Sequence, residues 1–286
     1  MTIGTRVSGV SDSAIIHEII ATAGWGITRE CVQVVLTLDP QAYVLGLDES
    51  GHPNGVGFGL GFHHSAWIGH LVVKPESRGQ GLGHRLFEAL LTRVRDLGKW
   101  PVYLTATEMG APLYAKFGFV EDGSLTRWEM PKSNRGTVSI EQNHANLLSV
   151  RTMETADLEE IVEFDTLRFG DNRGKLLRLF HMMYPKNGLI SRTSDGQVAG
   201  YLLGGTLGLG PFVADDEAAE PLLIHLLTMY PQGVPPALTF LDSNIRAREL
   251  CKAAGLEPTR TWVRMKLGDG CEPQDETLFN MSVAHG

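Results

Sequence analysis

The order of apolar and polar residues along the first half of the chain predicts a series of helices and strands. Apolar side chains recur every three or four residues in some stretches, as on one face of a helix, and form short β-branched runs in others. Thr28 stands where its side chain can cap the second helix. The predicted helices are residues 13–25, 28–38, 82–97 and 109–117, and the predicted strands are residues 42–48, 55–62, 66–73, 101–107 and 125–130.

The second half repeats this order of elements without repeating the sequence. Its predicted helices are residues 157–168, 176–183, 217–229 and 245–254, and its predicted strands are residues 150–153, 189–193, 197–203, 204–213, 237–241 and 259–267. We therefore expect the α/β fold class, in its α+β form with mixed sheets. The chain should contain two tandem domains, each with a twisted mixed β-sheet flanked by helices. The expected bounds are 1–134 and 148–268, with a polar linker at 135–147 and a flexible tail at 269–286.

The loop between the strand ending at Val73 and the helix starting at Leu82 carries glycines at alternate positions, Gly79, Gly81 and Gly83. Glycines there let backbone N–H groups point into one concavity, where the unpaired amides and the helix dipole favour a phosphate or pyrophosphate. A P-loop is excluded because no Lys followed by Ser or Thr comes after the last glycine. The glycine spacing also excludes a dinucleotide-binding fingerprint.

Arg78-x-x-Gly81-x-Gly83 is similar to the acyl-CoA pyrophosphate loop of the GNAT (GCN5-related N-acetyltransferase) superfamily. Residues 113–119, Leu-Tyr-Ala-Lys-Phe-Gly-Phe, resemble the family helix that supplies a tyrosine beside the thioester. The resemblance implies two GNAT-like domains and acetyl-CoA as co-substrate, with the end of the strand pairing with the pantetheine arm. The residues that it implies for acetyl-CoA binding are Leu71, Val72, Val73, Arg78, Gly79, Gln80, Gly81, Leu82, Gly83 and His84.

Acyl transfer to an amine needs a held thioester, a neutral amine and a proton for the departing thiolate. By the resemblance, Tyr114 is the general acid that supplies this proton. The N–H of Val73 or of an adjacent residue would polarise the thioester carbonyl. The general base stays open between His70, on the same strand, and Glu108, at the end of the next one. Trp67 occupies roughly the place where some family members carry a glutamate.

The second half departs from the family where the chemistry would be expected. Phe169-Gly170-x-x-Arg173, Gly210-Pro211-x-Val213-Ala214 and Arg264-Met265 look like the C-terminal domain of a bacterial and fungal tandem-GNAT family. At the place of the phosphate loop, however, three acidic residues at 215–217 satisfy the helix amides themselves and repel a pyrophosphate. We expect this degenerate domain not to bind acyl-CoA. Four charged residues either line an acceptor pocket between the domains or form an ion-pair network: Asp165, Arg168, Asp171 and Arg173.

Composition narrows the partners and the setting. The net charge of −8 argues against nucleic acid and favours a cationic or neutral acceptor. Three widely spaced cysteines without a Cys-x-x-Cys pair suggest neither disulfides nor a structural zinc site, and no metal is expected. No apolar segment approaches the length of a membrane span, and no signal peptide is recognised. We expect a cytoplasmic protein with no membrane partner, either a monomer or a homodimer.

Together these observations predict an N-acetyltransferase that moves the acetyl group of acetyl-CoA to a primary amine of a small molecule or amino acid. Two alternatives remain open at this point. One is a non-catalytic acyl-CoA-binding sensor or interaction protein built on the same fold. The other is an acetyltransferase that acts on a protein lysine or N-terminus.

Overall fold

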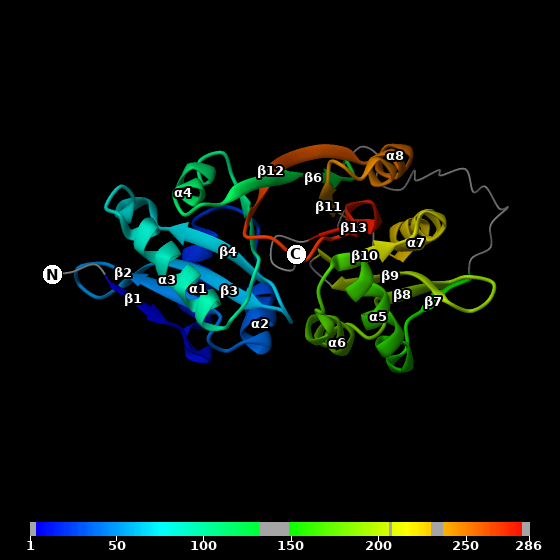
Figure 1. Cartoon of the computed structure of the whole chain (residues 1–286), viewed down its shortest axis with the longest axis horizontal. Helices are drawn as coiled ribbons and strands as arrows, with labels where there is room; N and C mark the ends of the chain where they lie inside the picture. Colours follow the sequence, from blue (N-terminus) through cyan, green and yellow to red (C-terminus); the bar gives the residue numbers. More distant parts are fainter. Residues whose placement is uncertain (1–3, 132–148, 206–207, 230–236, 282–286) are drawn as a thin grey trace. The chain divides into compact units, whose positions relative to one another are not determined.

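The computed structural model of the chain describes residues 4–131, 149–205, 208–229 and 237–281 (Figure 1). The chain divides into two compact units. Residues 1–121 and 265–270 belong to the first unit, and residues 122–264 and 271–285 belong to the second. The linker predicted at residues 135–147 lies outside the described residues.

The first unit contains most of the elements that the sequence predicts for the first half. Its helices are α1 (Ser13–Ala21), α2 (Arg29–Leu38), α3 (Leu82–Asp96) and α4 (Ala111–Ala115), and its strands are β1 (Gly4–Val7), β2 (Tyr43–Leu47), β3 (Pro53–Gly61), β4 (Ala66–Val73) and β5 (Val102–Ala106). The cap predicted at Thr28 is confirmed, because its side chain accepts a hydrogen bond from the Cys31 amide at 3.3 Å.

The sheet of the first unit is mixed. Its strands follow the order β1-β2-β3-β4-β5; β1 to β4 pair antiparallel, and β4 pairs parallel with β5. Helix α3, which connects β4 to β5, packs on β2, β3 and β4. A parallel pair requires such a crossover connection. The helix that begins at the glycine loop is therefore fixed to the sheet along its length.

Alternate glycines in β3 allow α3 to approach the sheet closely. A Cβ atom at Gly57 would lie 2.6 Å from Leu90, and one at Gly59 would lie 2.7 Å from Val94. Side chains at alternate strand positions share one face, so these glycines open a channel for the apolar face of the helix. This close packing holds the first turn of α3 in place relative to β4.

The second unit repeats the order of elements and adds one strand. Its helices are α5 (Leu158–Phe169), α6 (Gly174–Met183), α7 (Asp216–Met229) and α8 (Ile245–Ala253), and its strands are β7 (Ser149–Thr152), β8 (Gly188–Arg192), β9 (Val198–Gly205), β10 (Gly208–Ala214), β11 (Ala237–Leu241) and β13 (Leu278–Asn280). The two strands predicted over 197–203 and 204–213 are both present with a shifted boundary, because β9 ends at Gly205 and β10 begins at Gly208. The fold class predicted from the sequence is confirmed.

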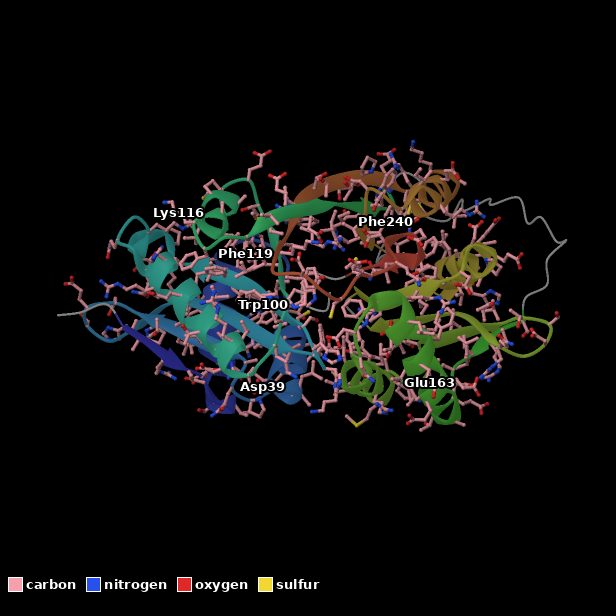
Figure 2. All side chains as sticks on the ribbon, viewed as in Figure 1. Asp39, Trp100, Lys116, Phe119, Glu163 and Phe240 are labelled. Atoms are coloured by element: carbon pink, nitrogen blue, oxygen red, sulfur yellow. The ribbon has the colours of Figure 1, made fainter. Side chains whose placement is uncertain are left out.

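Two strands carry residues of both units. β6 (Val120–Glu129) enters the second unit at Asp122, and β12 (Glu257–Leu267) enters the first at Met265. Within the second unit the hydrogen-bonded order is β12-β6-β11, and a five-stranded sheet follows the order β13-β10-β9-β8-β7. Its core includes Phe240 of β11, which Figure 2 labels, stacked on Trp128 of β6 at 6.1 Å between ring centroids.

The chain beyond residue 268 differs from the flexible tail that the sequence predicts. Residues 278–280 form β13 of the five-stranded sheet, and all three side chains are buried. The segment is too short and too mixed in polarity to be recognised as a strand by itself. Its partners are strands far away in the sequence, and only tertiary pairing reveals it.

Candidate functional site

The predicted site begins at an opening in the sheet of the first unit. The parallel pairing of β4 with β5 runs from Ala66 to Ile68 and then ends, although β4 continues to Val73. Backbone groups on that side of the strand are thus left without a strand partner among the described residues. An exposed strand edge of this kind can pair with an extended ligand.

A β-bulge accompanies this opening. Val56 of β3 pairs with Val72, and Phe58 pairs with Gly69, so Gly57 alone is opposed by both His70 and Leu71. His70 has a positive φ of 50°, which is uncommon for a residue other than glycine. A bulge bends its strand and ends regular pairing. The bulge therefore lies where β4 leaves β5.

The glycine loop lies directly after the open end of β4. A 3₁₀ turn, η2 (Pro75–Ser77), leads into it, and Gly79 and Gly81 adopt φ values of 75° and 83°. A Cβ atom at either glycine would meet no described residue within 4 Å, so the space beside the loop is open. The first turn of α3 carries no acidic residue. Its free amides and the helix dipole therefore present a positive field to an anion such as pyrophosphate.

Arg78 ties the loop to the end of β4. Its Nε donates a hydrogen bond to the carbonyl oxygen of Val73 at 2.9 Å, while the side chain is exposed. Gln80 is held similarly, because its amide nitrogen donates to the Glu76 carbonyl at 3.3 Å. The guanidinium of Arg78 makes no ion pair with any residue that the structure describes, so its charge stays available to a phosphate.

Tyr114 lies on α4, packed against the start of α3. Its ring centroid is 4.8 Å from that of Phe87 and 6.4 Å from that of Phe119, which Figure 2 labels. The side chain is 8% exposed, and burial raises the pKa of its hydroxyl to about 12. Among the described residues nothing hydrogen-bonds this hydroxyl. The hydroxyl is therefore protonated at neutral pH and free to donate a hydrogen bond to a ligand.

Helix α3 brings the glycine loop and α4 together. His84, in the first turn of α3, lies 4.8 Å from Phe117 between ring centroids, and Phe87, one turn later, also contacts Phe117 at 4.8 Å. The loop that can hold an anion and the helix that carries the tyrosine therefore share one aromatic cluster. No local sequence signal predicts this cluster, because it joins α3 to α4 across the intervening strand.

The two candidate bases have opposite surroundings. His70 is 2% exposed, its Nδ1 lies 2.9 Å from the Tyr43 hydroxyl, and its buried Nε2 has no hydrogen-bond partner among the residues that the structure describes. Burial lowers the pKa of His70 to about 4, so the ring is neutral at pH 7. Glu108, by contrast, is exposed in the turn after β5. Only Glu108 has direct access to solvent.

The start of α7 in the second unit differs from the start of α3. Asp216 and Glu217 occupy its first turn, and none of the glycines with positive φ lies there. Arg168 holds Asp215 with three hydrogen bonds of 2.7 to 2.9 Å, and Arg246 pairs with Asp216 at 2.8 Å. Carboxylates with arginine partners therefore stand at the start of α7, where α3 begins with glycines.

Three of the four charged residues on α5 and its C-terminal turn make ion pairs, Arg173 with Asp165 and Arg168 with Asp215, which favours the second of the two alternatives from the sequence. Arg173 is 2% exposed and donates two hydrogen bonds of 2.9 Å to Asp165, which also accepts one from the Tyr201 hydroxyl at 2.5 Å. Coulombic and hydrogen-bond contacts with Asp165 raise the pKa of Arg173, although burial by itself would lower it most strongly. An enclosed guanidinium of this kind cannot line a pocket, so the pocket interpretation of Arg173 is wrong.

Two features of the site escape sequence reasoning. One is Tyr43, which bonds His70 and whose own pKa is raised by burial. The other is the glycine period of β3, which is visible in the sequence as Gly55, Gly57 and Gly59 and indicates close helix packing. In the described ranges no group of three or more His, Cys, Asp or Glu side chains is arranged to hold a metal. No described helix has the length and apolarity needed to cross a membrane.

Comparison with known families agrees with the two-unit organisation. Residues 17–129 match a family model described as an acetyltransferase (GNAT) domain, and residues 161–280 match a second model with the same description. A curated relative, the uncharacterized N-acetyltransferase YitH of Bacillus subtilis (strain 168), is 29% identical over 170 residues. The match covers 58% of this chain and 57% of the relative, less than two thirds of its length.

Solved structures share the fold over nearly the whole chain. A putative acetyltransferase from Pyrococcus horikoshii has a TM-score of 0.81 at 22% identity, with 99% of this chain and 96% of that chain covered. A tandem GNAT protein from the clavulanic acid biosynthesis pathway has a TM-score of 0.67 at 16% identity, with 96% and 100% covered. With two GNAT models matched in series, this chain belongs to the GNAT acetyltransferase family and is a tandem GNAT protein.

Proposed function

We propose that this protein transfers the acetyl group of acetyl-CoA to a primary amine of a small molecule, and that the first unit performs the reaction. The proposal rests on the continuity between the end of β4 and the start of α3. The unpaired end of β4 leads directly into an open glycine concavity at the acid-free start of α3. An extended arm ending in a pyrophosphate fits such an arrangement.

Binding uses the backbone more than side chains. The amides at the start of α3 and the charge of Arg78 hold the pyrophosphate, and the open edge of β4 pairs with the amides of the pantetheine arm. This tether lies away from the bond that reacts, so it supplies position rather than bond-making. A backbone N–H near Val73 polarises the thioester carbonyl.

The reaction itself requires two proton transfers. The amine nitrogen attacks the thioester carbon, the carbon–sulfur bond breaks, and the thiolate takes a proton from the Tyr114 hydroxyl. The raised pKa of Tyr114 keeps its hydroxyl protonated at neutral pH and therefore able to donate. The acceptor amine loses its proton toward solvent by way of exposed Glu108. His70 is too enclosed to receive the amine proton directly, so we assign it a structural role in the bulge of β4.

The acceptor is proposed from charge. The chain carries 33 acidic and 25 basic residues, which favours a cationic amine over an anionic polymer. The test is a thiol-release assay with acetyl-CoA and a panel of amines and amino acids, run against a lysine-containing peptide. Turnover on at least one small amine supports the proposal. Tight acetyl-CoA binding without turnover on any member would instead favour a sensor.

A further inference from the structure

Strand β10 holds the place in the second unit that β4 holds in the first. Each is the last of four strands that pair antiparallel in chain order, and each leads into a long helix followed by another strand. In the first unit the edge of β4 is open beyond Ile68. In the second unit β13 pairs antiparallel with that edge of β10, with Asn280 opposite Phe212 and Leu278 opposite Val213.

The strand β13 is bonded to β11 as well. The Met281 amide donates a hydrogen bond to the Thr239 carbonyl at 2.6 Å. The side-chain amide of Asn280 bridges the two neighbours, donating to the Gly210 carbonyl at 2.8 Å and accepting from the Thr239 amide at 2.7 Å. The C-terminal segment thus fills the groove between β10 and β11 as an extended ligand would.

Side chains fix the register of this segment. Phe279 is 2% exposed and lies 5.2 Å from Phe212 between ring centroids. Asn244, which caps α8 through the Ala247 amide, donates to the carbonyl of Leu278 at 3.1 Å. The segment is therefore held by β10, by β11 and by Asn244, the capping residue of α8.

We propose that the groove between β10 and β11 is a strand-binding site whose ligand is residues 275–281 of the same chain. This peptide takes the place in the second unit that the pantetheine arm takes in the first. The comparison with pantetheine rests on the proposed function, but the binding of the peptide does not. Since β13 uses the edge of β10 and carboxylates occupy the start of α7, the second unit has exchanged an acyl-CoA site for a peptide site.

Asn280 is the residue that makes the site selective. Without it the Gly210 carbonyl and the Thr239 amide would each lose a buried hydrogen bond, and a buried polar group without a partner weakens binding. A leucine has nearly the same size but offers neither partner. The peptide in which Asn280 is replaced by leucine should therefore bind at least about tenfold more weakly, by the conversion of about 1.4 kcal/mol per factor of ten.

The experiment uses the full chain with a protease recognition sequence inserted between Gly270 and Cys271, where the chain passes from one unit to the other. After folding and cleavage, size-exclusion chromatography shows whether the segment stays with the protein. A fluorescently labelled peptide of residues 271–286 is then exchanged into the complex and followed by anisotropy. Competitors are the same peptide unlabelled, its N280L form, and its E276Q form as a control, because Glu276 is exposed.

The expected result is retention after cleavage, competition by the native and E276Q peptides, and at least about tenfold weaker competition by N280L. Immediate loss of the segment, or equal competition by N280L, would overturn the proposal. If the insertion prevents folding, hydrogen exchange on the uncut N280L chain decides. Fast exchange confined to residues 278–281 with β8 still protected supports a detachable ligand, and loss of protection throughout the unit contradicts it.

Discussion

The hydroxyl of Tyr43 lies 2.9 Å from Nδ1 of His70, and the two rings are enclosed at the bulge where β4 leaves β5. Phe58 closes the other side of the imidazole at 4.8 Å between ring centroids. The histidine that chemistry would nominate as a base is thus a neutral, buried part of the scaffold. Its protonation state bears on the stability of the fold before it bears on the reaction.

The first prediction concerns pH. Burial lowers the pKa of His70 from its ordinary value of 6.5 to about 4, so between these two pH values the unfolded chain binds a proton that the folded chain does not. His70 thus leaves stability intact above about pH 6.5 and reduces it as the pH falls toward 4, by on the order of 3 kcal/mol. Urea unfolding at pH 7 and pH 4 measures this loss. His70→Asn, which accepts the Tyr43 bond and tolerates positive φ, should remove this part of the slope.

The control for this prediction is His225→Asn, because His225 is exposed on α7. It should keep the slope of the unmodified chain. If His70→Asn and His225→Asn show the same pH dependence, the enclosed imidazole does not set the acid sensitivity of the first unit.

The second prediction concerns the glycine loop. Gly81→Glu places a side chain and a negative charge in the concavity at a φ of 83°, and acetyl-CoA binding should fall below detection in calorimetry. Gly196→Glu is a matched control, since Gly196 has a φ of 88° and equally open space in the β8–β9 turn. Unchanged acetyl-CoA affinity in a folded Gly81→Glu protein would mean that the loop is only a turn.

The third prediction concerns the number of sites. Calorimetric titration of the unmodified chain should give one acetyl-CoA per chain, because the second unit fills its groove with β13 and the start of α7 with carboxylates. The same titration at raised salt should weaken this one site, because the pyrophosphate contacts are electrostatic. Two equivalent sites would refute the assignment of binding to the first unit alone.

The fourth prediction concerns the proton donor. Tyr114→Phe should lower the turnover number by roughly 10²-fold, the lower end of general-acid effects because a thiolate is a good leaving group, with acetyl-CoA affinity nearly unchanged. Tyr184→Phe, which removes a hydroxyl from a half-buried residue of the second unit, serves as the control. Steady-state turnover on the acceptor found in the amine panel is the measurement. Equal turnover in both variants would make Tyr114 a packing residue.

The fifth prediction concerns the enclosed ion pair of the second unit. Arg173→Met leaves Asp165 buried without its partner and should destabilise the protein by about 3–5 kcal/mol. Arg178→Met breaks an exposed pair with Glu159 and should cost less than about 1 kcal/mol. Denaturant unfolding distinguishes them. A loss of acceptor turnover in Arg173→Met without loss of stability would restore the pocket interpretation.

Local patterns in the sequence were sufficient for helices α1 to α4 and strands β2 to β5 of the first unit, and for the position of the glycine loop, but not for β1. Thr28 caps α2 as predicted, and the alternate glycines stand at the start of α3, because caps and turns depend on neighbours a few residues away. The adjacent carboxylates predicted for a helix start in the second half do lie there, with Asp216 and Glu217 in the first turn of α7. These are short-range effects that a single segment carries within itself.

Tertiary structure decided what distant segments do to one another. The sequence nominated His70 as a candidate base, and the structure encloses it between Tyr43 and Phe58. The sequence predicted a tail at residues 278–280, and the structure hydrogen-bonds this segment to β10 and β11. The sequence left Arg173 available to a ligand, whereas in the structure it is paired with Asp165, which also accepts a hydrogen bond from Tyr201. Burial sets the pKa of a side chain, and long-range pairing sets the partners of a strand. Neither the pKa nor the strand partner can be predicted from neighbouring residues in the sequence.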